Sequence, residues 1–194
     1  MDPMRQRLLA EATRQFVERG FDGTAMREIA DACGVTKAAL YYHYAGKADL
    51  LRDIVGGYLD ELGAAISEGR AAAPGYADQL RAIVRGMFGL PVGDRAIMRL
   101  AMHDLRHLSD ADRDAFGAAY HARFLQPLAD VIRGGMDAGE FTPRNPTTVL
   151  WMVLGMLYPF FSSPPQATDE DQVVADLLDV LLLGLSARPG VPDA

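Results

Sequence analysis

The side chains between residues 36 and 44 are of types that contact nucleic acid. Thr36, Lys37 and Ala38 open this stretch, and Tyr41 and Tyr42 follow one helical turn later. A lysine ammonium donates to guanine O6 or N7, a threonine hydroxyl donates or accepts, and an alanine methyl packs on thymine methyls. A tyrosine hydroxyl at the end of a rigid ring suits a phosphate oxygen, which fixes register on a duplex. The stretch therefore indicates a surface that touches both base edges and backbone.

A second group, His103, Asp104 and His107, has the spacing of a metal site. Two histidines four residues apart share a helix face, and the pattern is a weak form of HExxH with Asp in place of Glu. The alternative function is thus an all-α metal-dependent protein or enzyme that uses His103 and His107. His121 is the one further histidine in the region, so we expect two partly exposed histidines, with no metal and no cofactor.

Other enzyme chemistry has no framework in this sequence. The Ser, His and Asp residues are not set in a nucleophile elbow, a P-loop or a dinucleotide fingerprint. We therefore expect a protein that is not an enzyme.

The composition describes a globular chain that folds without cross-links. Its 194 residues are 49% hydrophobic and 23% charged, which excludes a disordered polyelectrolyte. The single cysteine, Cys33, excludes a disulfide framework and indicates a reducing cytoplasm. The N-terminus has charges among its apolar residues, unlike a signal peptide. The longest apolar run, 149–161, contains Pro159 and is too short for a bilayer, so no membrane role is expected.

Charge is distributed unevenly along the chain. The net charge is −7, which argues against general binding to nucleic acid. Residues 1–52 nevertheless carry eight Lys or Arg side chains against seven Asp or Glu, so the excess acid lies after residue 52. A local basic surface near the N-terminus is compatible with this distribution.

The N-terminal pattern predicts three short helices that form a helix-turn-helix. The first spans Pro3 to Arg19 and ends at Gly20. Thr24 is expected to cap a second helix over 25–32, and Gly34 supplies the sharp turn after it. Thr36 caps a third helix over 37–44. A helix, a four-residue turn with glycine and a second helix are the sequence form of this DNA-binding motif.

The rest of the chain is also expected to be helical. A long helix follows over 47–70. Further helices are predicted at 76–89, 94–107, 110–137, 146–161 and 169–186, with breaks at proline, glycine and serine positions. Pro127 is expected to kink or split the 110–137 segment. The expected domains are 1–46 for DNA binding, 47–187 for effector binding and dimerisation, and a flexible tail at 188–194.

The N-terminal quarter resembles the tetracycline-repressor (TetR) family of bacterial regulators. The resemblance rests on Gly20-Phe21-Asp22-Gly23-Thr24, Ile29-Ala30, Gly34-Val35, Leu40-Tyr41-Tyr42-His43-Tyr44 and Lys47-Ala48-Asp49-Leu50-Leu51, and it covers about residues 5–52. Two positions depart from the family pattern, because Ala25 replaces a second Thr and Tyr44 replaces the usual Phe. Neither departure touches the helical architecture.

The resemblance implies which residues meet DNA. The leading end of the third helix lies in the major groove, so the implied base contacts come from Thr36, Lys37 and Ala38. Phosphate contacts are implied for a set of residues around this helix: Thr24, Arg27, Tyr41, Tyr42, His43 and Lys47. We expect Tyr44, one turn after Leu40, to be buried. The implied fold is all-α, with a three-helix DNA-binding domain joined by a long helix to a C-terminal helical domain.

The C-terminal part is rich in methionine and aromatic residues, most of which we expect in the core. The resemblance implies that some line a cavity for an unknown small-molecule effector. The expected lining is Met87, Phe88, Met98, Met102, His103, Tyr120, Phe124, Trp151, Met152 and Met156. Thioethers and flat rings suit an apolar or aromatic ligand.

The last two predicted helices carry more apolar surface than one subunit covers. We expect them to form an isologous four-helix interface between two copies. The expected interface residues are Val153, Leu157, Phe161, Val174, Leu177, Leu178, Leu181 and Leu182. Such a dimer would set two DNA-reading helices about 34–36 Å apart on a near-palindromic operator.

The sequence thus favours a homodimeric, sequence-specific transcriptional regulator that an effector releases from DNA. The family resemblance implies that it is a repressor. Two alternatives remain besides it. One is the metal-dependent protein or enzyme based on His103 and His107. The other is a helical adaptor that binds a partner protein and whose N-terminal unit never meets DNA.

Overall fold

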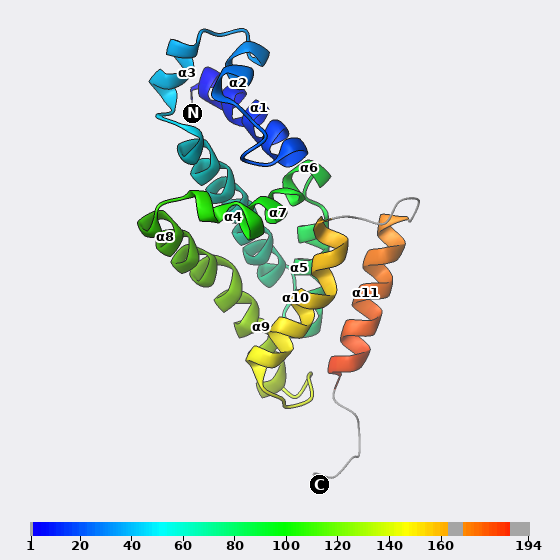
Figure 1. Cartoon of the computed structure of the whole chain (residues 1–194). Coiled ribbons are helices and arrows are strands. Elements are labelled where there is room, and N and C mark those ends of the chain that lie inside the picture. Colours follow the sequence, from blue (N-terminus) through cyan, green and yellow to red (C-terminus); the bar gives the residue numbers. More distant parts are fainter. Residues whose placement is uncertain (1, 163–168, 187–194) are drawn as a thin grey trace. The chain divides into compact units, whose positions relative to one another are not determined.

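The chain is built from helices, as its structure, a computed structural model, shows for residues 2–162 and 169–186 (Figure 1). It divides into two compact units. The first unit contains residues 1–60 and 91–118, and the second contains 61–90 and 119–194. This division differs from the predicted boundary after residue 46, since 47–60 and 91–118 pack with the N-terminal helices. The tail at 188–194 lies outside the described residues.

The first unit holds the predicted helix-turn-helix and a second stretch of chain. Its elements are α1 (Pro3–Arg19), α2 (Met26–Ala32), α3 (Lys37–His43), the first part of α4 (Lys47–Ala71), α6 (Val92–Arg95), α7 (Ile97–His103), the 3-10 turn η1 (Leu105–His107) and most of α8 (Asp110–Tyr120). The α2 helix packs on α1 and α3, and α7 packs on α1.

Local signals set the ends of α1. The Asp2 carboxylate accepts a hydrogen bond of 3.1 Å from the Met4 amide, and Pro3 occupies the first turn. At the other end Gly20 takes a φ of 75°, which favours glycine, and its amide donates to the Phe16 carbonyl. The predicted bounds of this helix are confirmed.

The turn between α2 and α3 also follows the sequence. Gly34 has a φ of 67°, and the Thr36 hydroxyl accepts a hydrogen bond of 3.2 Å from the Ala39 amide as the cap of α3. Leu40, on the inner face of α3, is fully buried. The turn therefore fixes which face of α3 points outward.

The predicted single helix over 94–107 is wrong, because the structure has three pieces there. Ala96 separates α6 from α7, and Asp104 separates α7 from η1. Arg95 is buried at the end of α6, and Ile97, Met98 and Leu100 bury the inner face of α7.

The second unit consists of helices that pack on one another. It holds the end of α4, α5 (Tyr76–Phe88), the π-helical turn η2 (His121–Leu125), α9 (Gln126–Asp137), α10 (Pro146–Ser162) and α11 (Glu170–Leu185). Helix α9 packs on α5 and α10, and α11 packs on α5 and α10. None of the described helices is long and apolar enough to cross a membrane.

Two close approaches position α5 in this unit. The Glu140 carboxylate accepts hydrogen bonds from the amides of Tyr76 (3.1 Å) and Ala77 (2.9 Å). These amides lie in the first turn of α5 and have no carbonyl partner within the helix. On α4, a Cβ added at Gly69 would lie 2.7 Å from the Ile83 backbone nitrogen. The glycine therefore allows α4 and α5 to touch.

Pro127 splits the long predicted helix, as expected. Proline lacks the N–H that would bond to the Arg123 carbonyl, and the turn before it widens into η2. The Gln126 amide donates to the His121 carbonyl five residues back, which is the π-helical pattern. Helix α9 then continues from Gln126.

Candidate DNA-binding interface

The outward face of α3 carries the residues predicted to meet bases. Thr36, Lys37 and Ala38 are exposed at the leading end of this helix. Tyr41 and Tyr42 follow on the same side, with 43% and 86% of their surface exposed. About two helical turns thus present a cation, a hydroxyl, a methyl and two phenols to a single partner.

Neighbouring rings restrain these exposed side chains. The Lys37 ammonium lies 5.5 Å from the centre of the Tyr41 ring, a cation–π contact. Tyr42 meets the His43 ring edge-on, with centroids 5.2 Å apart. We call the exposed side of α3 that carries Lys37, Tyr41 and Tyr42 the reading face. Its side chains lose less conformational freedom when they bind a duplex, because these contacts already restrain them.

His43 lies in a different position from its neighbours. Only 15% of its side chain is exposed, and its Nδ1 is 3.6 Å from an oxygen of Asp2, the residue that caps α1. The imidazole links the end of α3 to the start of α1. This geometry gives His43 a structural contact, and its predicted phosphate contact stays a prediction.

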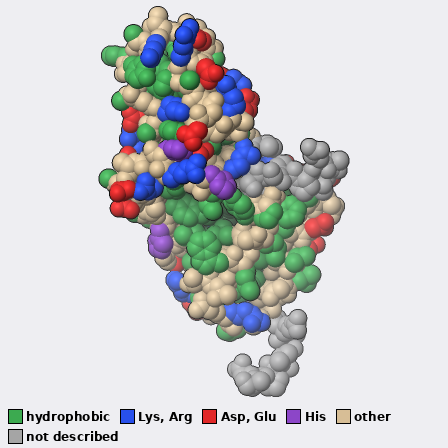
Figure 2. Space-filling model, in the orientation of Figure 1, with side chains coloured by type: hydrophobic (Ala, Val, Ile, Leu, Met, Phe, Trp, Pro, Cys, Tyr) green, Lys and Arg blue, Asp and Glu red, His purple; other side chains and the backbone are tan. Residues whose placement is uncertain are grey.

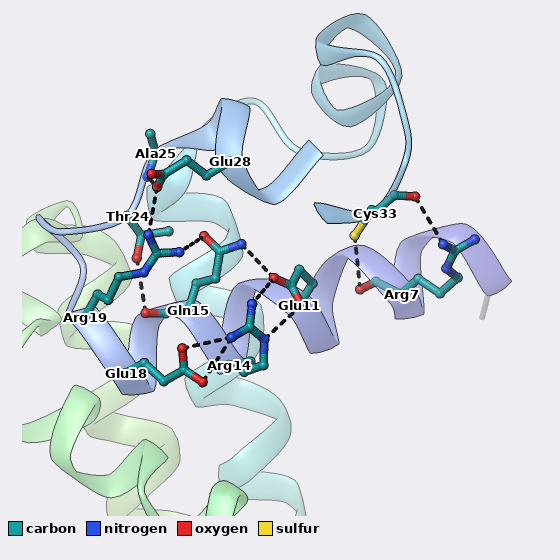
Figure 3. Close-up of polar contacts among 10 residues, drawn as sticks. All are labelled: Arg7, Glu11, Arg14, Gln15, Glu18, Arg19, Thr24, Ala25, Glu28 and Cys33. Carbon is teal, nitrogen blue, oxygen red and sulfur yellow. Dashed lines mark hydrogen bonds and ion pairs between the residues drawn. The ribbon is translucent and has the colours of Figure 1, made fainter. Parts of the chain in front are cut away.

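A chain of polar side chains positions α2 against α1 (Figure 3). The buried Gln15 amide donates to Glu11, and Arg19 donates to the Gln15 oxygen at 2.7 Å. Arg19 also reaches Glu28 at 3.3 Å, and this carboxylate accepts the Ala25 amide at 3.0 Å. This network was not predicted, although Glu28 three residues after Ala25 has the spacing of a capping box.

The predicted role of Thr24 as the cap of α2 is wrong. The cap residue of α2 is Ala25, and Thr24 lies one position outside the helix. Its hydroxyl is buried, within 3.1 Å of the Gly20 carbonyl and 3.2 Å of the Gln15 carbonyl (Figure 3). The hydroxyl is thus engaged with backbone carbonyls inside the motif, and the predicted phosphate contact of Thr24 stays a prediction. Arg27, in contrast, is highly exposed and forms only a loose pair with Asp31 at 3.5 Å.

Lys47 is also engaged within the protein. Its ammonium donates to the carbonyls of Phe21 (2.7 Å) and Thr24 (2.9 Å), and it lies 4.4 Å from the centre of the Phe21 ring. These bonds tie the start of α4 to the α1–α2 turn. Two of the three ammonium hydrogens are used in this way, which gives Lys47 a structural contact, and its predicted phosphate contact stays a prediction.

Tyr44 is buried, as predicted. Its ring packs in the core of the first unit, with the Arg5 guanidinium 5.1 Å from the ring centre. Burial, with a smaller effect from the Asp53 charge, raises the pKa of Tyr44 to about 12. The phenol stays neutral at any physiological pH.

The two histidines of the metal hypothesis do not converge. His103 is exposed, whereas the His107 ring stacks on Phe21 with centroids 4.3 Å apart. Among residues 2–162 and 169–186, no group of three His, Cys, Asp or Glu side chains is placed to hold a metal ion.

Comparison with known proteins agrees with the helix-turn-helix geometry. Residues 8–54 match the family profile "Bacterial regulatory proteins, tetR family", and residues 74–160 match "Tetracyclin repressor-like, C-terminal domain". The HTH-type transcriptional repressor KstR2 of Rhodococcus jostii (strain RHA1) is 27% identical over 137 residues, which are 71% of this chain and 67% of KstR2. The chain belongs to the TetR family.

Solved structures of TetR-family type share the whole fold. A regulatory protein of the tetR family from Rhodococcus RHA1 aligns with 97% of this chain and 100% of its own, at a TM-score of 0.86 and 22% identity. AibR in complex with isovaleryl coenzyme A and operator DNA aligns with 92% of this chain and 98% of its own, at a TM-score of 0.80 and 24% identity. The predicted all-α architecture is confirmed.

Membership of the TetR family decides between the functional alternatives. The chain is a DNA-binding transcriptional regulator and not an enzyme. The metal-dependent alternative based on His103 and His107 gains no support from its relatives or from the geometry.

The predicted effector residues of this TetR-family chain fall in both units. Met98, Met102 and His103 belong to the first unit. The second unit holds Met87, Phe88, Tyr120, Phe124, Trp151, Met152 and Met156. Within the second unit Tyr120 stacks on the buried Phe124 at 5.1 Å, and burial raises the pKa of Tyr120 to about 12. Trp151 and Met152 are exposed, so they do not line an interior cavity.

Two cavities of the second unit include one predicted effector residue each. The larger, of about 410 Å³, lies between α5 and α11 and is lined by Arg85, Phe88, Gly89, Glu170, Asp171, Val174 and Ala175. The smaller, of about 270 Å³, lies between α10 and α11 and is lined by Met156, Phe160, Val173, Asp176, Leu177 and Val180. The charged residues of the larger cavity were not predicted, because they carry no recognisable spacing.

The residues predicted for a dimer interface mostly face the inside of the subunit. Val153, Leu157, Val174, Leu177, Leu178, Leu181 and Leu182 are all buried in the single chain. The side chain of Phe161 lies outside the described structure. The large apolar side chains that α10 and α11 leave exposed are Trp151, Met152, Val180 and Leu183. Periodicity identified the two apolar helices, and the predicted interface residues stay a prediction beside these exposed side chains.

Proposed function

We propose that this chain is a homodimeric TetR-type repressor that binds a near-palindromic operator and leaves it when a small molecule binds. The observation that carries the proposal is the outward face of α3, where Lys37, Tyr41 and Tyr42 stand exposed on a helix capped by Thr36. A capped helix with its polar leading end free can enter a major groove.

The base contacts are proposed for the leading end of α3. Thr36, Lys37 and Ala38 would face base edges, and Tyr41, Tyr42 and Arg27 would hold phosphates on either side. Thr24 and Lys47 drop out of this set because their polar atoms hold the α1–α2 turn. The remaining set is small, and the net charge of −7 weakens attraction to DNA of any other sequence.

Dimerisation is proposed through the outer stripes of α10 and α11. Trp151 and Met152 lie on α10, and Val180 and Leu183 lie on α11, all exposed in the single chain. Figure 2 shows hydrophobic side chains over these two helices at the surface of the second unit. Gly155 and Gly184 lie in the same stripes, and a Cβ at either would meet nothing within 4 Å, which leaves room for close helix contact. A second copy that presents the same stripes would cover this surface.

The effector is proposed to bind in the second unit. The cavity of about 410 Å³ between α5 and α11 lies within the usual size range of small-molecule sites. Phe88 and Val174 offer apolar contact, whereas Arg85 and Asp171 offer opposite charges. This lining favours a ligand with polar groups at its rim over a purely apolar one. AibR was solved with both isovaleryl coenzyme A and operator DNA, so the fold accommodates both kinds of partner.

Release from DNA requires that the effector distinguish two conformers. A ligand weakens operator binding only by its difference in affinity for the DNA-competent and incompetent states. The chain passes between the two units inside α4, at residues 90–91, and inside α8, so these are the covalent routes for such a change. A regulator of this type acts where the genome is, in the cytoplasm.

The test is selection of bound DNA from a random pool, followed by a screen for compounds that release the selected sequence. We expect a sequence with two related half-sites one helical turn apart and saturable binding by a dimer. The absence of any enriched sequence would overturn the proposal, as would enrichment of an asymmetric site that a monomer binds.

A further inference from the structure

We infer that Arg99 and His107, which lie far outside the helix-turn-helix, are positioning residues for operator binding. Both hold the end of α1 and the α1–α2 turn, to which the DNA-reading helices are attached. The inference rests on the proposed function, because it concerns how the same chain keeps its reading helix in place.

Arg99 anchors the end of α1. Its Nη2 donates a hydrogen bond of 2.6 Å to the Val17 carbonyl. This carbonyl belongs to the last turn of α1, where helical carbonyls have no amide partner within the helix. A guanidinium at this end also interacts favourably with the helix dipole. Helix α7 packs on α1, and the hydrogen bond from Arg99 fixes the orientation of the two helices at this contact.

His107 holds the turn that follows. Its ring stacks on Phe21 with centroids 4.3 Å apart and planes 12° from parallel. Its Nε2 is 3.5 Å from the Asp22 carboxylate and 3.8 Å from that of Asp104. The Arg106 Nε donates to the same nitrogen at 3.3 Å. His107 and Arg106 thus contact the first two residues after Gly20, Phe21 and Asp22.

The turn is also fixed from the DNA-binding side. Lys47 donates to the carbonyls of Phe21 and Thr24, and its ammonium lies on the same ring that His107 stacks against. Helix α2 begins directly after this turn and packs on α3. A displacement of Phe21 therefore displaces α2 and, with it, the reading face of α3.

The compact units support this assignment. Residues 91–118 pack in one unit with residues 1–60, although the C-terminal family profile spans 74–160. The segment that carries Arg99 and His107 is continuous with the second unit at both of its ends. Residues 91–118 are therefore placed to hold α2 and α3 in one position. A shift of this segment would shift both helices.

The test measures affinity for the selected operator in variants of the full chain. Arg99→Ala and His107→Ala remove the two contacts, whereas Arg99→Lys keeps a cation and His107→Phe keeps a stacked ring. Asp114→Ala is the matched control, since Asp114 is exposed on the same segment and has no predicted binding role. Each variant is compared by thermal melting, by light scattering for its oligomeric state, and by the dependence of affinity on salt.

We expect Arg99→Ala and His107→Ala each to lose about three- to tenfold in affinity, the scale of one hydrogen bond or one aromatic pair. The conservative variants should recover most of this loss, and the control should bind as the unaltered chain does. The salt slope should stay unchanged, because a positioning residue neutralises no phosphate.

Three results would overturn the inference. These are unaltered affinity in both alanine variants, an equal loss in Asp114→Ala, or a lower salt slope in Arg99→Ala, which would make Arg99 a phosphate contact. If His107→Ala does not fold, Arg99→Ala decides, because it removes only a surface side chain. A chain that binds no selected DNA at all contradicts the proposed function instead.

Discussion

The Lys47 ammonium lies 4.4 Å from the centre of the Phe21 ring and donates a hydrogen bond of 2.7 Å to the Phe21 carbonyl. It reaches the Thr24 carbonyl as well, at 2.9 Å. One side chain thus joins the first residue of α4 to the turn between α1 and α2. A lysine that the family resemblance assigns to DNA is, in this chain, part of the structure that supports the reading helix.

Replacing Lys47 should therefore affect stability first. We expect Lys47→Ala to lower the free energy of unfolding by about 1–2 kcal/mol, because a cation–π contact and two hydrogen bonds are lost. Urea unfolding followed by circular dichroism measures this. Lys37→Ala is the control, since Lys37 is exposed and should change stability little. Unaltered stability of Lys47→Ala together with a reduced salt slope for operator binding would restore the phosphate contact.

The reading face itself should respond in the opposite way. Lys37→Ala and Tyr42→Ala should each weaken operator binding about tenfold or more and leave the melting temperature within a degree or two of the unaltered chain. Lys37 should also determine base preference at one position of each half-site, which repeated selection with the variant would show. Arg144→Ala removes an exposed cation from the second unit and should bind normally; a comparable loss there would indicate nonspecific electrostatics.

Two glycines of α4 should give opposite results when replaced by alanine. A Cβ at Gly57 meets nothing within 4 Å, so Gly57→Ala should stabilise the protein by about 1 kcal/mol through helix propensity. A Cβ at Gly69 would lie 2.5 Å from Ile83 Cγ1 and 2.7 Å from its nitrogen, so Gly69→Ala should destabilise by about 1–3 kcal/mol. Paired denaturation curves test both, and an equal sign for the two changes would contradict the α4–α5 contact.

Alkaline pH should destabilise the first unit through Tyr44. Its pKa is about 12 in the folded chain and about 10 when unfolded, so the unfolded state ionises first. The contribution is complete below about pH 10 and is lost as the pH rises toward 12. Tyr44→Phe should show a shallower loss of urea midpoint across this range, whereas Tyr42→Phe, altered at an exposed ring, should follow the unaltered chain. Identical pH profiles for all three would show that Tyr44 ionises normally.

A charge on the outer stripe of α11 should separate the proposed dimer. Leu183 is 76% exposed in the single chain, and Leu183→Asp would place a carboxylate against the partner's apolar stripe. Light scattering after size-exclusion chromatography should show a monomer. Met102→Asp is the control, because Met102 is 63% exposed on α7 of the first unit and is not a residue of the stripe. A dimeric Leu183→Asp would place the interface elsewhere.

Local signals in the sequence were enough for most of the helices. Asp2 with Pro3, Gly20, Gly34, and Thr36 each act on the few residues beside them, through a cap or a positive φ. The bounds of α1 and the start of α3 therefore follow from neighbouring residues alone. The outward position of Lys37, Tyr41 and Tyr42 follows too, since Leu40 occupies the inner face.

Contacts between distant residues could not be predicted in this way. Thr24 and Lys47 have the right types for phosphate contacts, but the fold places carbonyls of the same turn within reach of both. The stripe that α11 buries depends on where α5 and α10 lie, so Leu178 and Leu183 differ in exposure although both are leucines of one helix. His107 reaches Phe21 across 86 positions of sequence. Hydrogen bonds and packing of this kind depend on three-dimensional neighbours, which only the tertiary structure decides.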